Sequence, residues 1–290
     1  AVSTSSPALL LSRLIGETQN IRLGSGGMML PNFPPLVVAE QFGMLQAMAP
    51  GRIDLGIGRA PGTNGLTASA LRRGHIGVED FPEQLEELLH FLEDDFPAGN
   101  KYKEKVFAVP GPGQDRENGI ERSFDAPSVW LLGSSGYSAQ LAGKLGLPFA
   151  FAAQLAPENL SIAFDLYRKN FRPSEILDQP YTIASFSVFA ADSEEEARIQ
   201  THSFSHSMLR MMKGESYVIP SPEELKNYNY SEYESYVLDS WNQKMIQGTA
   251  DQVVAGLRTF HSCHCLSLRT LGRPRGRPRR APSRARGSGI

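Results

Sequence analysis

Hydrophobic positions along the chain switch repeatedly between two spacings. Leu85, Leu88 and Leu92 recur at helical spacing with acidic residues on the opposite face, which predicts an amphipathic helix over residues 79–96. Residues 53–58 instead form a short apolar run, which is typical of a buried strand. Segments of these two kinds follow one another along most of the chain, so strands and helices are expected in turn.

The bounds of the expected elements come from this pattern and from the turn residues between segments. The sequence predicts strands at 21–30, 53–58, 129–132, 148–152 and 182–190. It predicts helices at 8–16, 34–48, 79–96, 135–145, 158–171, 193–212 and 250–260. Two polar stretches, 97–127 and 212–242, are expected to be loop excursions, the second of them lid-like.

Alternating strands and helices indicate an α/β protein with a parallel sheet, either open and doubly wound or closed into a barrel. The length of 290 residues suits a single TIM-type (β/α)8 barrel, which needs about 250. No apolar run approaches the roughly 20 residues of a membrane helix. The two cysteines, Cys263 and Cys265, lie too close together for an ordinary structural disulfide, so a cytoplasmic protein is expected.

Charge separates a body, residues 1–260, from a tail, residues 261–290. The net charge is −2, and removing the eight arginines found after residue 268 leaves −10 for residues 1–268. The Arg/Pro-rich tail has too few apolar residues to build a core, so we expect it to be disordered. It is either a basic arm that can contact nucleic acid or a non-native sequence from a shifted reading frame, and the acidic body disfavours nucleic acid. Its start, His261–Cys265, holds four metal-capable side chains at a spacing that zinc sites do not use.

Three segments of the body carry candidate chemistry. Arg59 directly follows a buried strand, and there its guanidinium can grip a phosphate or form a rim salt bridge. Residues 133–138, Gly-Ser-Ser-Gly-Tyr-Ser, join a strand to a helix, where backbone N–H groups favour an anion; a plain serine N-cap is the alternative. Residues 24–27, Gly-Ser-Gly-Gly, interrupt a strand, which indicates a bulge, a glycine kink or the close approach of a ligand.

These segments also resemble those of a known family. Residues 21–32, IRLGSGGMMLPN, with 35–41, PLVVAEQ, are followed by 50–62, PGRIDLGIGRAPG, and by 130–142, WLLGSSGYSAQLA. The three motifs, in this order, resemble the flavin-dependent monooxygenases of the bacterial-luciferase-like family, and the resemblance covers roughly residues 1–260. It implies a (β/α)8 barrel that binds reduced FMN and uses O2 on a small organic substrate, with a flavin reductase as FMN supplier. A homo-oligomer is compatible with this reading.

The resemblance also implies roles for particular residues. Arg59 would meet the FMN phosphate together with the loop residues Ser135, Gly136, Tyr137 and Ser138. Ser25, Gly26 and Gly27 would lie against the isoalloxazine ring. We therefore expect a non-proline cis peptide or a strong β-bulge at Gly26-Gly27.

The chain departs from the family pattern at both ends. The family's first two strands, the second of which ends in an acidic-histidine motif, have no counterpart here, and its last strand and helix should follow Phe260. We expect about six of eight β-α units, no assignable catalytic residue, and poor coupling of reduced flavin to oxygenation in an open barrel.

Three other functions stay open at this point. Relatives with the same barrel transfer hydride with a deazaflavin in place of FMN. A non-catalytic flavin binder or partner subunit would fit the missing histidine. A nucleic-acid-binding protein would use the basic tail.

Overall fold

The computed structural model describes residues 5–60, 62, 65–71, 79–121, 123–215 and 218–264. Five parallel strands form one sheet in the order β1 (Leu23–Met29), β2 (Ile53–Gly58), β3 (Ser128–Gly133), β4 (Phe149–Ala152) and β5 (Thr182–Ser185). Two further strands, β6 (Val188–Ala190) and β7 (Ile246–Gly248), pair with each other in parallel. The tail from residue 265 onward, including the predicted disorder there, lies outside the described residues.

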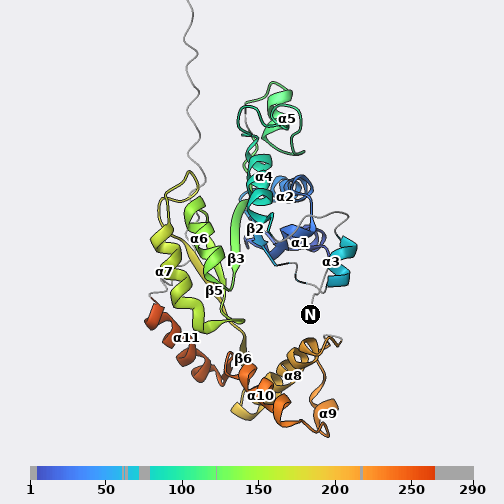
Figure 1. The fold of residues 1–290 in the computed structure, drawn as a ribbon, viewed down its shortest axis with the longest axis vertical. Coiled ribbons are helices and arrows are strands. Elements are labelled where there is room, and N and C mark those ends of the chain that lie inside the picture. The colour runs from blue at the N-terminus through green and yellow to red at the C-terminus, as the bar shows by residue number, and fades with distance from the viewer. Residues whose placement is uncertain are drawn as a thin grey trace, which may run out of the picture.

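Helices connect successive strands, except β5 and β6, which follow one another directly (Figure 1). The helices before β3 are α1 (Pro7–Glu17), η1 (Leu30–Asn32), α2 (Pro35–Met48), α3 (Gly65–Leu71), α4 (Phe81–Glu93) and α5 (Pro112–Glu117). Those after it are α6 (Gly136–Leu145), η2 (Pro157–Asn159), α7 (Leu160–Asn170), α8 (Glu194–Met212), α9 (Pro222–Leu225), α10 (Glu232–Asn242) and α11 (Ala250–His264). None of the helices within the described ranges is both long and apolar enough to cross a membrane.

The predicted α/β class with a parallel sheet is confirmed. All strand pairs in the described part of the chain are parallel, and six strand-helix units succeed one another, ending in α2, α4, α6, α7, α8 and α11. A right-handed crossover through a helix is the usual way to join parallel strands, so this order follows from the alternation of the hydrophobic pattern.

The structure differs from the prediction at the strand expected over 182–190. That segment is divided into β5, which pairs with β4, and β6, which pairs with β7. Phe186 marks the break and packs against Phe260 of α11, with ring centroids 4.7 Å apart. A contact with a helix far along the chain does not alter the local spacing of hydrophobic residues. The sequence pattern therefore predicted one continuous strand across the break.

Three elements near the C-terminus were missed: α9, α10 and β7. The stretch predicted as a lid-like loop contains α10, which begins with a capping box between Ser231 and Glu234. The short strand β7, which precedes α11, was not predicted, and the segment after Phe260 where the family's last strand was expected lies almost wholly outside the described residues. With three residues and Gly248 at φ 135°, β7 is too short for an alternating pattern to show.

The core lies between the five-stranded sheet and the helices that cover it. Phe149 and Phe151 of β4 are fully buried and pack edge to face against Phe164 of α7. Tyr167, also fully buried, donates to Leu147 O at 3.0 Å and accepts from Tyr181 N at 3.1 Å. Burial raises the pKa of Tyr167 to about 12, so this phenol stays protonated and fixes the loops before β4 and β5.

We predict that Gly143→Ala destabilises the fold because α6 and α7 touch there. A Cβ on Gly143 would lie 2.7 Å from Tyr167 O and 3.1 Å from Phe171 N, both of them backbone atoms. Overpacking of this kind costs about 1–3 kcal/mol, more than the ~1 kcal/mol that alanine gains in a helix. The midpoint of urea denaturation, followed by circular dichroism, should fall.

Gly16→Ala is the matched control. Gly16 also lies in a helix, α1, but is exposed, and a Cβ there would have no neighbour within 4 Å. This variant should be unchanged or slightly more stable. Equal shifts in both variants would show that close packing of α6 on α7 is not what Gly143 provides.

Candidate functional site

The carboxyl ends of β2 and β3 lie side by side, because these strands are parallel neighbours with Gly58 opposite Leu132. Arg59 follows β2 at this edge, and the loop to α6 follows β3. Active sites of β/α barrels are built from loops at this end of the strands. The two segments that the sequence singled out separately therefore meet.

Arg59 lies over the first turn of α6. Its guanidinium carbon is 4.2 Å from the centroid of the Tyr137 ring, a cation-π contact. Arg59 is half-buried, and within the described part of the chain no carboxylate forms an ion pair with it. The predicted alternative, a rim salt bridge, is absent from those residues. A positive charge without a carboxylate partner thus stands at the amino end of α6, whose backbone dipole has the same sign.

The serines of this loop take different positions. Ser135 is the N-cap residue of α6, is exposed, and makes no capping hydrogen bond with its side chain. Ser138 is only 6% exposed, and a Cβ on Gly133 would lie 2.7 Å from its Oγ. Glycine at position 133 therefore allows the end of β3 to approach the first turn of α6. Because Ser135 makes no capping hydrogen bond, the first backbone N–H groups of α6 have no side-chain cap.

The glycines of β1 form the irregularity that the sequence predicts. The Gly26-Gly27 peptide is cis, and the register of β1 against β2 shifts between Gly26 and Met28. A Cβ on Gly27 would lie 2.9 Å from Gly56 O, whereas a Cβ on Gly26 would meet nothing within 4 Å. Gly27 is thus required by the contact between the strands, and Gly26 faces open space.

Ser25 fastens this irregular segment to β2. Its Oγ donates to Gly56 O and accepts from Gly56 N, each at 3.1 Å. Both bonds occupy the hydroxyl, so Ser25 shapes the edge of the site through its position on β1.

A cavity of about 300 Å³ opens on the side that Gly26 faces. Its walls come from all five strands of the larger sheet or from residues just before them: Arg22, Gly24, Ser25, Gly26, Asp54, Gly56, Trp130, Leu132, Ala150, Tyr181 and Ile183. Most of its lining is apolar near the strand centres, and the polar groups gather at the amino ends. A flat aromatic ligand with one polar edge suits such a space.

Sequence reasoning missed the polar end of this cavity. Arg22 donates to both oxygens of Asp54, at 2.9 and 2.6 Å, and Trp130 Nε1 donates to Asp54 Oδ1 at 3.0 Å. The hydrogen bonds to Asp54 raise the pKa of Arg22, and burial raises that of Tyr181, whose ring lies 5.3 Å from the Trp130 ring. The sequence did offer a signal for this ion pair, because Arg22 directly precedes β1 and Asp54 lies at the start of the neighbouring strand β2.

No metal site accompanies these groups in the described residues, where no three His, Cys, Asp or Glu side chains lie together. The side chains of the His261–Cys265 segment lie outside the part of the chain that the structure describes.

Parallel strands joined by helices place the chain in the α/β class, and its likeness to solved structures identifies the sheet as part of a TIM-type barrel. The chain belongs to the luciferase-like monooxygenase family, whose sequence profile matches residues 1–264. It is 45% identical over 259 residues to the Bacillus subtilis protein YvbT, covering 89% of this chain and 73% of that one. An Escherichia coli luciferase-like monooxygenase is 39% identical, covering 89% and 72%. An N-acetyl-S-alkylcysteine monooxygenase of Bacillus subtilis is 36% identical, covering 88% and 73%.

Solved structures show the same fold. Apo-MsnO8 superposes with a TM-score of 0.74 at 29% identity, covering 91% of this chain and 74% of that one. The oxygenating constituent of 3,6-diketocamphane monooxygenase from Pseudomonas putida, in complex with FMN, gives 0.58 at 19% identity, covering 90% and 75%. An F420-dependent secondary alcohol dehydrogenase gives 0.60 at 15% identity, covering 90% and 76%.

We predict that Asp54→Ala lowers stability, because it leaves the half-buried Arg22 guanidinium and the buried Trp130 N–H without their shared acceptor. Loss of such an acceptor costs about 1–3 kcal/mol. Asp54→Asn keeps an acceptor oxygen and should lose less. Urea denaturation ranks the three proteins, and equal stability of Asp54→Ala and wild type would show that this network does not stabilise the barrel.

Proposed function

We propose that this chain is the FMN-binding part of a monooxygenase that uses reduced flavin and O2 on a small organic substrate. The observation that carries the proposal is the Arg59 guanidinium, which lies over Tyr137 at the start of α6 without a carboxylate partner among the described residues. The family membership supports the monooxygenase class, and the site supports a phosphate-bearing cofactor.

The phosphate end of FMN fits the loop after β3. Arg59 supplies a full positive charge, and the uncapped N–H groups of Gly136 and its neighbours supply oriented donors. Ser135 and Ser138 add hydroxyl groups on the same turn. In this proposal Tyr137 holds the guanidinium in place through its ring.

The ring end of FMN fits the cavity beside β1. Gly26 has room for a flat ligand within 4 Å of its backbone, and Ser25 and Gly27 set the position of that backbone. Reduced FMN supplies, when bound, the electrons that activate O2. The chain's own part is to bind the phosphate, orient the ring at Gly26 and exclude water with apolar walls such as Leu132 and Ile183.

A deazaflavin is the second cofactor to consider, because the F420-dependent neighbour shares the fold. At 15% identity that likeness concerns the fold alone, whereas the relatives named monooxygenases are 36% and 39% identical. We therefore favour FMN. With only two cysteines in the sequence, the chain also fits a reducing compartment such as the cytoplasm, where a flavin reductase can supply reduced FMN.

The reaction is tested by supplying reduced FMN from NADH and a flavin reductase, with N-acetyl-S-benzylcysteine as the probe substrate. We expect transfer of one oxygen atom from labelled O2 to the probe, beside release of peroxide. Peroxide without any labelled product from this and other small organic sulfides would contradict a monooxygenase. Tighter binding of F420 than of FMN would favour the deazaflavin reading.

We predict that Arg59→Ala weakens FMN binding by about one to two orders of magnitude, because a charge-assisted hydrogen bond contributes about 1.5–3 kcal/mol. Arg13→Ala is the matched control, since Arg13 is exposed on α1 and pairs with Glu17 of the same helix. Isothermal titration with FMN separates the two variants. Equal affinities of the two variants for FMN would show that the FMN phosphate does not bind at Arg59.

We predict that Gly26→Ala weakens FMN binding without loss of stability. The added methyl group meets no protein atom within 4 Å, but it occupies the space proposed for the ring. A steric conflict of about 1–3 kcal/mol corresponds to roughly 5- to 150-fold in affinity. Titration with FMN and urea denaturation are measured on the same preparation. Unchanged affinity would show that the ring does not lie at Gly26.

A further inference from the structure

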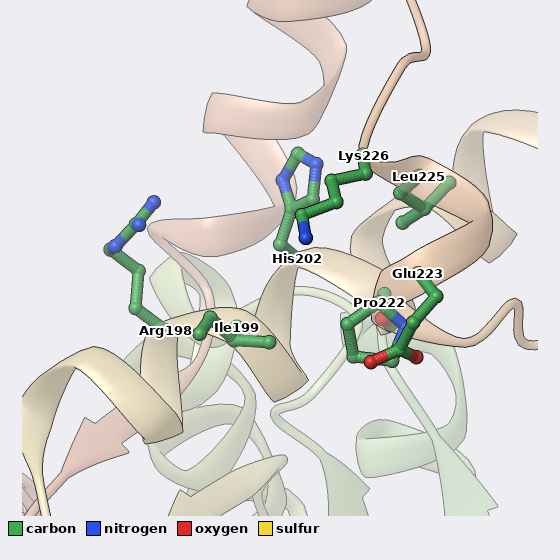
Figure 2. A pocket seen from close by; sticks show the side chains of 8 residues that line it. Arg198, Ile199, His202, Pro222, Glu223, Leu225 and Lys226 are labelled. Atoms are coloured by element: carbon green, nitrogen blue, oxygen red, sulfur yellow. The ribbon is translucent and has the colours of Figure 1, made fainter.

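A second cavity, of about 440 Å³, lies between α8 and α9, and it shares no residue with the proposed flavin site. Figure 2 shows its side chains: Arg198, Ile199 and His202 rise from α8, and Pro222, Glu223 and Leu225 come from α9 with Lys226 directly after it. Ser203 of α8 also lines it. We call His202, Ser203 and Lys226 the polar side, and Ile199, Pro222 and Leu225 the apolar side.

The hydroxyl of Ser203 is the first sign of an absent partner. Ser203 is 5% exposed, and its Oγ is enclosed without any hydrogen bond. Its neighbours on the same helix behave differently, because Thr201 donates to Ala197 O at 2.8 Å and Ser207 to Phe204 O at 2.6 Å. A buried hydroxyl usually finds a partner, so the one exception among these three points to an acceptor from outside the chain.

His202 can offer a donor to the cavity. Its Nε2 lies 3.1 Å from Tyr230 Oη, and the same oxygen lies 2.9 Å from His206 Nδ1. Tyr230 keeps its proton at neutral pH, because burial raises its pKa to about 12. When the phenol donates to His202 Nε2, the imidazole proton resides on Nδ1, where an anion can accept it.

The charges of the lining favour an anion. Lys226 is exposed and, in the described ranges, has no carboxylate in ion-pair contact. Arg198 is held by Glu195 in two hydrogen bonds of 2.8 and 2.7 Å, so part of its field is already compensated. Among its described residues the lining holds one acid, Glu223, which forms no ion pair with Lys226 there. Lys226 is therefore the cation of the lining that can still pair with an anion, and Ile199, Pro222 and Leu225 supply apolar surface in the same cavity.

We propose that the cavity between α8 and α9 binds a small organic anion, with its charged group on the polar side and its apolar body against the apolar side. A carboxylate on a short aliphatic chain has this chemistry. The charged group accepts hydrogen bonds from Lys226, His202 and Ser203. This site is independent of the flavin site and of the reaction proposed above.

The test uses hexanoate as the probe, with 1-hexanol and inorganic phosphate as matched partial probes. Binding is followed at pH 7.5 through the imidazole resonances of His202, assigned with a His202→Gln variant. Hexanoate should shift them and bind at least about tenfold more tightly than either partial probe. Equal binding of hexanol would show that the charge is not used, and equal binding of phosphate would show that the apolar side is not used. No binding of hexanoate would overturn the site.

Three variants are expected to change the affinity for hexanoate in three different ways. Lys226→Met should weaken hexanoate binding about three- to tenfold, as an exposed charge contributes modestly. Glu223→Gln should strengthen it, because it removes the only acid of the lining. Lys169→Met, on the exposed face of α7, is the control and should change nothing.

Ser203→Ala separates binding from folding. Removal of an unpaired buried hydroxyl should leave the thermal midpoint unchanged or raise it, while hexanoate binding weakens about tenfold. A variant that loses stability and keeps its affinity would show that Ser203 is a structural residue. Lys226→Met with unchanged affinity would likewise contradict the proposal.

Discussion

β1 and β2 approach so closely that side chains are excluded from several positions between them. A Cβ on Gly24 would lie 2.9 Å from the Asp54 Cβ, and one on Gly27 would lie 2.9 Å from Gly56 O. Ser25 uses the same closeness to make both of its hydrogen bonds to Gly56. The approach fixes the path of β1 and leaves Gly26 facing the cavity.

The two ends of these strands differ in how their charges are satisfied. At the amino ends the carboxylate of Asp54 is paired with Arg22 and accepts from Trp130, so the charges of this pair compensate each other. At the carboxyl ends Arg59 has an aromatic ring beneath it and no carboxylate partner in the described residues. An anion is therefore attracted to one end only, which orients any cofactor that carries a phosphate at one end and a ring at the other.

Local patterns predicted what local forces decide. The helical spacing of Leu85, Leu88 and Leu92 gave α4, and apolar runs bounded by glycine and proline gave β2 and β3, within a few residues. The loop serines and Arg59 were singled out as candidates because their segments follow such strands. The division between β5 and β6 was not found, because it is set by pairing with two different strands, β4 and β7, that lie elsewhere in the sequence. The pairing of Arg22 with Asp54 was missed for the same reason, since the two residues are 32 positions apart.

The helices that follow β6 show a different use of buried polar groups. Tyr230 bridges His202 and His206, Ser205 donates to Asn242 Oδ1 at 2.6 Å, and Lys213 pairs with Glu234. The last pair, with the backbone N–H of Ser231, lowers the pKa of Glu234 to about 2, so the carboxylate stays charged and holds α10 to α8 over the neutral range. In this network the hydroxyl of Ser205 and the ammonium group of Lys213 both meet acceptors. The buried hydroxyl of Ser203, on the same helix α8, has no hydrogen-bond partner. Because buried hydroxyl groups usually have one, this group indicates that the cavity beside it binds a ligand.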